Sequence, residues 1–254
     1  MEIYYTITTF IFGIIFGSFF NVVGYRLPKG ESLISPPSHC TKCNHRLKPI
    51  ELVPVFSYIF LKGKCKVCGQ KISLFYPIFE LATGILFSTS YLIFGLNIDF
   101  LIAITFISTL LIIIISDYQT MIIPDELLIF SGIVLLIELF VKGGLDLAFT
   151  SFLNGVIAFT IMFLLKKFGD FLFKKESMGG GDIKLMLLFG FVLGYQTTIL
   201  SIFFASLIGL PVSLFILFRK KEDIIPFGPF LAVSAILILL TKIDFNFLLN
   251  LYGI

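Results

Sequence analysis

The sequence predicts an all-α, polytopic membrane protein with about eight transmembrane helices and one small polar module. Hydrophobic residues make up 57% of the 254 residues and charged residues only 14%, whereas about a quarter of a typical soluble domain is charged. The mean hydropathy is +1.03, and long apolar runs recur along the chain. The net charge of +3 is small, so we expect no nucleic-acid partner and a lipid bilayer as the main environment.

The apolar runs define the expected membrane segments, each to be compared with the roughly 20 residues that a full span requires. The first run follows only Glu2 and lacks a basic leader, so we expect a retained helix rather than a cleaved signal peptide. The sixth run is short, and part of 178–182 is expected to continue it. The segments are 5–24, 74–95, 100–116, 122–141, 147–165, 183–194, 197–218 and 229–250.

The distribution of Lys and Arg predicts the orientation of these segments. With the N-terminus outside, 17 of the 19 basic residues fall in or beside the cytoplasmic loops, and only Lys142 and Lys242 fall outside. Basic residues favour cytoplasmic loops. This topology places Asp117 and Asp182 at the cytoplasmic boundary, at the ends of the third and sixth segments.

The polar loop 25–73 carries all four cysteines, as Cys40-Thr-Lys-Cys43 and Cys65-Lys-Val-Cys68. Two such pairs with 21 residues between them indicate a closed, structural four-thiolate zinc site, although the separation is slightly long. Redox-active or unpaired thiols are the alternative, but structural disulfides are uncommon in the reducing cytoplasm.

Residues beside the cysteines are consistent with a metal-binding turn. Asn44 and Gly69 directly follow the two pairs, and both tolerate a left-handed backbone. His39 and His45 could replace a cysteine as ligands or could be ordinary polar loop residues. A module this small gains stability from a bound metal.

Two acids are the candidate catalytic residues. Asp182 follows three glycines at the entry to an apolar run, and Asp117 ends another apolar run, where the helix dipole disfavours an anion. Ionisable groups at membrane depth are candidates for function. A cap on the next helix would also explain Asp182. Asp125 and Glu126 follow Pro124 in a first helical turn, where acids are stabilising, so we discount them as catalysts.

Two carboxylates at matched depth predict aspartic-protease chemistry. One takes a proton from water while the other, protonated, polarises the scissile carbonyl. Helix polarity favours Asp182 as the base and Asp117 as the protonated member. A proton-coupled transporter would instead place its acids near the midplane, and a scaffold would explain the cysteines but neither acid.

The chain resembles the type IV prepilin peptidases along nearly its whole length. The GxGD motif of Gly179 to Asp182 is shared with other membrane proteases, but the ordered set of motifs is specific. It comprises Gly17-Ser-Phe-Phe-Asn21-Val-Val-Gly-Tyr25-Arg26-Leu-Pro28, the paired cysteines, Tyr76-Pro-Ile-Phe-Glu80, Asp117 with Ile123-Pro-Asp125, Gly179-Gly-Gly-Asp182 and Pro226-Phe-Gly-Pro-Phe230.

The resemblance implies a bifunctional enzyme of the bacterial inner membrane. It implies that the enzyme cleaves the basic leader of a prepilin or pseudopilin after a glycine, on the cytoplasmic side, with Asp117 and Asp182. It further implies N-methylation of the new N-terminal residue with S-adenosylmethionine, for which 17–28 and 76–80 are candidate regions without assigned ligand residues. Pilus or secretion assembly proteins are expected as further partners.

The resemblance also suggests a division of the chain and a mode of recognition. We expect a first helix at 1–24, the zinc module at 25–73 and the peptidase bundle at 74–254. Because the cytoplasmic loops are themselves basic, a basic leader must be recognised by acids or backbone acceptors, and Glu80, Asp125 and Glu126 are the candidates.

Overall fold

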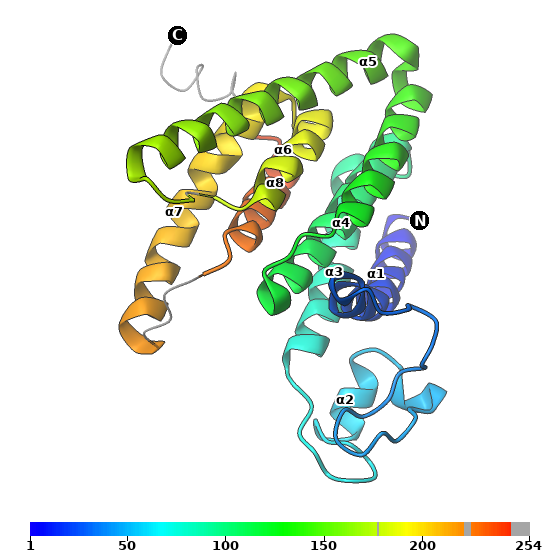
Figure 1. The fold of residues 1–254 in the computed structure, drawn as a ribbon. Coiled ribbons are helices and arrows are strands. Elements are labelled where there is room, and N and C mark those ends of the chain that lie inside the picture. Colours follow the sequence, from blue (N-terminus) through cyan, green and yellow to red (C-terminus); the bar gives the residue numbers. More distant parts are fainter. Residues whose placement is uncertain (177, 221–224, 245–254) are drawn as a thin grey trace. The chain divides into compact units, whose positions relative to one another are not determined.

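The computed structural model describes residues 1–176, 178–220 and 225–244 (Figure 1). Within these ranges the chain is helical, and its only β-type pairing is two isolated bridges in the loop before α3. The elements are α1 (Glu2–Arg26), η1 (Leu27–Lys29), η2 (Pro49–Glu51), α2 (Phe56–Phe60), α3 (Phe75–Phe94), α4 (Ile98–Thr120), α5 (Asp125–Phe173), α6 (Gly180–Leu193), α7 (Tyr195–Lys220) and α8 (Gly228–Thr241).

The predicted all-α class and the predicted apolar segments are confirmed. Segments 122–141 and 147–165 fall in α5, except that 122–124 precede the helix; α5 is interrupted at Gly143 and Gly144, and Gly144 has φ +71°. The last predicted segment matches α8, but its residues 245–250 lie outside the described part. Among the described residues, five helices are long and apolar enough to cross a membrane: Glu2–Lys29, Phe75–Phe94, Ile98–Thr120, Asp125–Phe173 and Tyr195–Ile216.

The chain divides into two compact units, Met1–Gly95 and Leu96–Ile254. In the first unit α1 packs along α3, with the cysteine-containing loop between them in sequence. A Cβ at Gly13 would lie 2.7 Å from the Gly84 backbone, so the helices approach closely only because both positions are glycine. The two glycines therefore allow α1 and α3 to form a closely packed helix pair.

Two buried polar residues lie along this helix pair. Asn21 donates through Nδ2 to the Gly17 carbonyl at 3.2 Å and to the Tyr76 carbonyl at 3.4 Å. Glu80, which is also buried, accepts a 2.7 Å hydrogen bond from the Val55 amide. Glu80 therefore joins the start of α3 to the loop that precedes it.

The second unit contains α4 to α8. Helix α6 packs on α5, where a Cβ at Gly190 would lie 2.5 Å from the Gly155 Cα, and α8 packs on both α4 and α7. Phe106 of α4 meets Phe189 of α6 edge to face, with ring centroids 5.6 Å apart, and both rings are fully buried. This core brings the ends of α4, α6 and α8 together.

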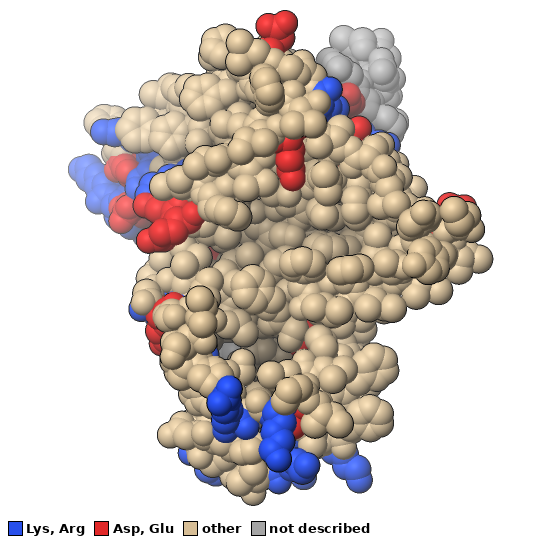
Figure 2. All heavy atoms as spheres, turned by 90° about the vertical axis from the view of Figure 1, so that its right-hand side faces the viewer, with Lys and Arg blue, Asp and Glu red and all other residues tan. Residues whose placement is uncertain are grey.

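Charge is unevenly distributed on the surface. The face seen in Figure 2 consists mostly of uncharged residues, as expected for helices in contact with lipid. Lys and Arg side chains gather at the bottom of that view, over the loop before α3, which contains Lys29, Lys42, Arg46, Lys48, Lys62, Lys64, Lys66 and Lys71.

Candidate active site and metal centre

Asp117 lies in the last turn of α4, and its side chain is buried, with the residue only 6% exposed. The helix ends at Thr120 because Met121 adopts a left-handed conformation, and the Met121 amide bonds to the Asp117 carbonyl at 2.9 Å. The following turn, 121–124, leads directly to the start of α5. Asp117 is therefore fixed by a tight connection rather than by a flexible loop.

Asp182 lies in the first turn of α6 and is 9% exposed. The N-cap of α6 is Gly179, and no side chain caps this end. The alternative that Asp182 is there to cap the helix is therefore wrong. An acid in the first turn still gains from the helix dipole.

Gly228, the first residue of α8, lies against the side chains of both acids. A Cβ at this position would lie 2.5 Å from Asp117 Oδ2 and 3.5 Å from Asp182 Oδ1. The two carboxylate oxygens are therefore no farther apart than the sum of these distances, about 6 Å. The Gly228 amide also donates a hydrogen bond to the Asp117 carboxylate. The carboxylates are close enough to act on one water molecule.

The importance of Gly228 was not foreseen, although the segment 226–230 was identified as a motif. The available signal was a glycine directly before Pro229, with Pro226 two residues upstream. Which of the two acids carries the shared proton stays a prediction, because in a coupled pair the proton belongs to both groups.

The three acids proposed for leader recognition have different surroundings. Asp125 is exposed and pairs with Lys184, whose Nζ lies 2.7 Å from both carboxylate oxygens. Glu126 is exposed beside it on α5. Glu80 belongs to the first unit, is buried and bonds to the Val55 amide. Only Asp125 and Glu126 are therefore presented to solvent.

The four cysteines converge, with all four sulfurs within 4.8 Å of one another. The two pairs form matching turns, in which the Asn44 amide bonds to the Cys40 carbonyl at 2.9 Å and the Gly69 amide to the Cys65 carbonyl at 3.0 Å. Asn44 has φ +55° and Gly69 φ +69°, so the predicted left-handed positions are confirmed.

The sulfur separations fit a tetrahedral metal ion. The Cys40 and Cys68 sulfurs are 3.8 Å apart and the Cys43 and Cys65 sulfurs 3.9 Å. Zinc–sulfur bonds of about 2.3 Å in a tetrahedron give sulfur–sulfur edges of about 3.8 Å. Backbone N–H groups of Cys43 and Lys42 lower the pKa of the Cys40 thiol to about 6, which favours the thiolate that a metal requires.

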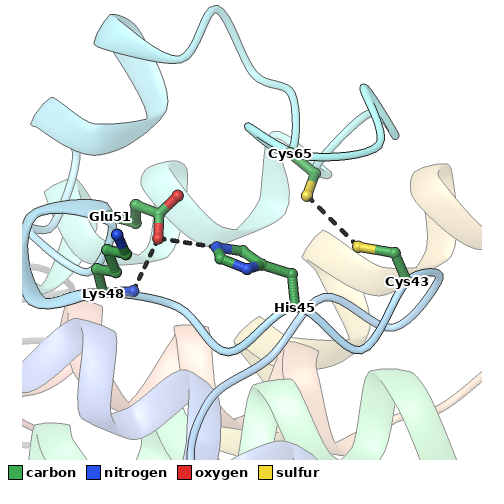
Figure 3. A network of polar contacts seen from close by, with 5 residues as sticks. All are labelled: Cys43, His45, Lys48, Glu51 and Cys65. Carbon is green, nitrogen blue, oxygen red and sulfur yellow. Dashed lines mark hydrogen bonds and ion pairs between the residues drawn. The ribbon is translucent and has the colours of Figure 1, made fainter.

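The histidines beside the cysteines have other partners. His45 Nε2 lies 3.2 Å from Glu51 Oε2, which also accepts a 2.8 Å hydrogen bond from the Lys48 amide (Figure 3). His39 Nδ1 lies 3.0 Å from the Pro37 carbonyl. The Lys48 amide, followed by the His45 ring, lowers the pKa of the Glu51 carboxyl. These contacts fit the second alternative, in which both histidines are ordinary polar residues of the loop and not metal ligands.

The candidate regions for the methyl donor, 17–28 and 76–80, lie on facing parts of α1 and α3, since Asn21 reaches the Tyr76 carbonyl. Asn21 Oδ1 is buried and has no hydrogen-bond partner among the described residues. The two regions are therefore adjacent, as a shared role would require.

Comparison with known proteins identifies the chain's relatives. The family model for the bacterial peptidase A24 N-terminal domain matches residues 11–94, and that of the type IV leader peptidase family matches residues 104–214. No solved structure was found to match the chain.

Three relatives carry the name prepilin leader peptidase/N-methyltransferase. The protein from Bacillus subtilis is 37% identical over 90% of this chain and 91% of its own length. The protein from Neisseria gonorrhoeae is 31% identical over 88% of this chain and 86% of its own length. The protein from Myxococcus xanthus is 30% identical over 84% of this chain and 63% of its own length. The chain belongs to the type IV leader peptidase family.

Proposed function

We propose that the chain is a membrane aspartic endopeptidase that cleaves the leader of type IV prepilins or pseudopilins and then N-methylates the new N-terminal residue. The observation that carries the peptidase assignment is the convergence of Asp117 and Asp182 at the Gly228 amide. The names of the relatives support both the substrate class and the methylation step.

Asp117 and Asp182 are the proposed catalytic residues. One carboxylate removes a proton from a water molecule, whose oxygen attacks the scissile carbonyl carbon, while the protonated carboxyl donates a hydrogen bond to the carbonyl oxygen. The tetrahedral intermediate then collapses as the leaving amine receives a proton. The Gly228 amide orients Asp117 during these transfers, because it donates to that carboxylate.

The proposed location is the bacterial inner membrane, with the dyad at the cytoplasmic boundary. The excess of Lys and Arg in loops on the same side as both acids supports this orientation. The apolar stem of a prepilin would lie in the bilayer beside the bundle, and the positively charged leader would stay in the cytoplasm. Pilus or secretion assembly proteins are proposed as partners on that side.

We propose that Cys40, Cys43, Cys65 and Cys68 bind a structural zinc ion. Their four thiolates fill a tetrahedral site and leave no open position for substrate. The ion would hold two turns together in a module, 25–73, that is too small to form a large core. Segments 1–24 and 74–254 complete the proposed functional division of the chain.

The proposed methyl donor is S-adenosylmethionine, which supplies a methyl group to an amine. Regions 17–28 and 76–80 are the proposed place for this step, supported by their adjacency on α1 and α3. No ligand residue is assigned within them.

The test is to incubate the purified protein with a prepilin, with and without S-adenosylmethionine, and to analyse the products by mass spectrometry. We expect a leader peptide in both reactions and a methylated N-terminus only with the donor. Asp117→Asn and Asp182→Asn should each lower the rate at which the leader product forms by on the order of 10²–10⁴-fold. Cleavage at the wild-type rate by a folded variant lacking either carboxyl group would refute the assignment.

A further inference from the structure

Lys184 lies near the start of α6, two residues after Asp182 and just past the first turn of the helix. Its side chain is 51% exposed. A basic residue at a cytoplasmic edge fits the topology, but the contact that Lys184 makes is with another element.

The partner of Lys184 is Asp125, in the first turn of α5. Nζ lies 2.7 Å from both oxygens of this carboxylate, and Asp125 is itself 56% exposed. The pair joins two helix starts that are far apart in the chain. Each of these starts is close in sequence to one of the two buried acids.

The pair completes a ring of contacts around the two carboxylates. From Asp117 the chain passes through the turn 121–124 to Asp125, and from Lys184 it returns to Asp182. Inside the ring, α6 presses on the turn, since a Cβ at Gly181 would lie 2.9 Å from Ile123 Cβ. Gly228 closes the opposite side, where its absent Cβ makes room for both carboxylates.

We propose that the Asp125–Lys184 ion pair is a positioning clamp that sets the separation of the two catalytic carboxylates. The proposal rests on the proposed peptidase function. Neither residue is assigned a contact with the scissile bond. The pair acts through the helix starts that carry it, and its loss lets α6 shift against the turn 121–124.

The exposure of the pair distinguishes this role from a role in stability alone. Exposed ion pairs contribute about 0–1 kcal/mol to folding and are screened by salt. Catalysis is more sensitive to the separation of the carboxylates, because a misplacement of about 1 Å can lower the rate by about 10²-fold. Breaking the clamp should therefore change kcat with little change in melting temperature.

The chain contains a matched control pair. Lys142 Nζ lies 2.6 Å from Asp99 Oδ1, and the two side chains are 40% and 39% exposed. This pair joins α4 to α5, but it links the start of α4 to the residue before the interruption of α5 at Gly143, away from Asp117. Its removal should affect packing as much as removal of Asp125–Lys184, without affecting the carboxylates.

The test compares steady-state cleavage of a prepilin by four proteins: Lys184→Gln, Asp125→Asn, the charge swap Asp125→Lys/Lys184→Asp, and Lys142→Gln. The swap keeps an ion pair between the same two positions. It only exchanges which position carries the positive charge and which the negative. We expect each single clamp variant to lower kcat by about three- to thirtyfold with KM nearly unchanged. The swap should recover kcat to within about threefold of wild type, and Lys142→Gln should equal wild type.

The clamp would be overturned by no recovery of kcat in the swap or by an equal loss of kcat in Lys142→Gln. A loss confined to KM would also overturn it and would assign Asp125 to substrate binding. Wild type and Asp182→Asn are measured in the same assay. An inactive wild type, or an active Asp182→Asn, would count against the proposed peptidase function, whereas the clamp is judged only from the ratios among active variants.

Discussion

The two units of the chain build their candidate sites in opposite ways. In the first unit the four sulfurs come from two short turns whose backbone hydrogen bonds repeat each other, so most of the site is local in sequence. In the second unit Asp117, Asp182 and Gly228 come from three helices, and only helix packing joins them. The two family models match one unit each. The comparison predicts that damage to one site leaves the chemistry of the other largely intact.

The largest expected effect is the loss of cleavage on removal of either acid. Asp117→Asn and Asp182→Asn should each lower kcat by on the order of 10²–10⁴-fold, because proton transfer in both directions needs both carboxyls. Metal content, measured by inductively coupled plasma mass spectrometry, should equal that of wild type. A parallel loss of metal would contradict the independence of the two sites.

Gly228→Ala should produce the next largest effect. The new Cβ would lie 2.5 Å from Asp117 Oδ2, so the carboxylate must move, and we expect kcat to fall by about 10–10²-fold. Gly180→Ala is the matched control, because a Cβ at this position would meet no atom within 4 Å. Cleavage rates of the two variants give the comparison. Equal rates would show that the space at Gly228 is not needed.

Cys65→Ser should empty the metal site with a smaller effect on cleavage. Cys65 is the buried member of the cluster, and an incomplete ligand set binds zinc far more weakly. We expect close to one zinc ion per wild-type chain, almost none in the variant, and a several-fold loss of cleavage at most. His39→Ala is the control, because this ring bonds to the Pro37 carbonyl, and it should keep its metal. Loss of metal from His39→Ala would make this histidine a ligand.

Acidification should release the metal with the smallest perturbation of the protein. The Cys40 pKa is lowered to about 6, so its thiolate is present above this pH and is lost as the pH falls through it. Metal affinity should fall progressively as the pH falls, because protons compete for all four sulfurs, and the loss should continue until the Cys40 thiolate is protonated near pH 6. The zinc content per chain after dialysis at pH 8, 7, 6 and 5 measures this loss of affinity. Retention that does not change down to pH 5 would contradict the assigned direction.

Much of this architecture was predictable from sequence because it is encoded locally. Apolar runs set the helices, and the spacing of the cysteines together with Asn44 and Gly69 indicated the metal-binding turns. Asp117 and Asp182 stood out because they end or begin apolar runs. Each of these signals lies within a few residues of the feature that it indicates.

The features that the sequence left unassigned depend on contacts between distant segments. The room that Gly228 leaves for two carboxylates exists only after α8 packs on α4. Lys184 looked like one more basic residue at a cytoplasmic edge, and Asp125 like a helix-dipole acid, until the ion pair joined them. The pairing of α3 with α1 depends on Gly13 meeting Gly84, which composition does not reveal.

The order of Asp117, Asp182 and Gly228 along the chain has a consequence for biosynthesis. Ribosomes deliver the N-terminal segments first, so α4 and α6 enter the membrane with Asp117 and Asp182 before α8 has been translated. During that interval the two acids lack the glycine backbone that packs against Asp117. A nascent chain therefore carries an incomplete protease site, and proteolytic competence begins only after α8 has been translated.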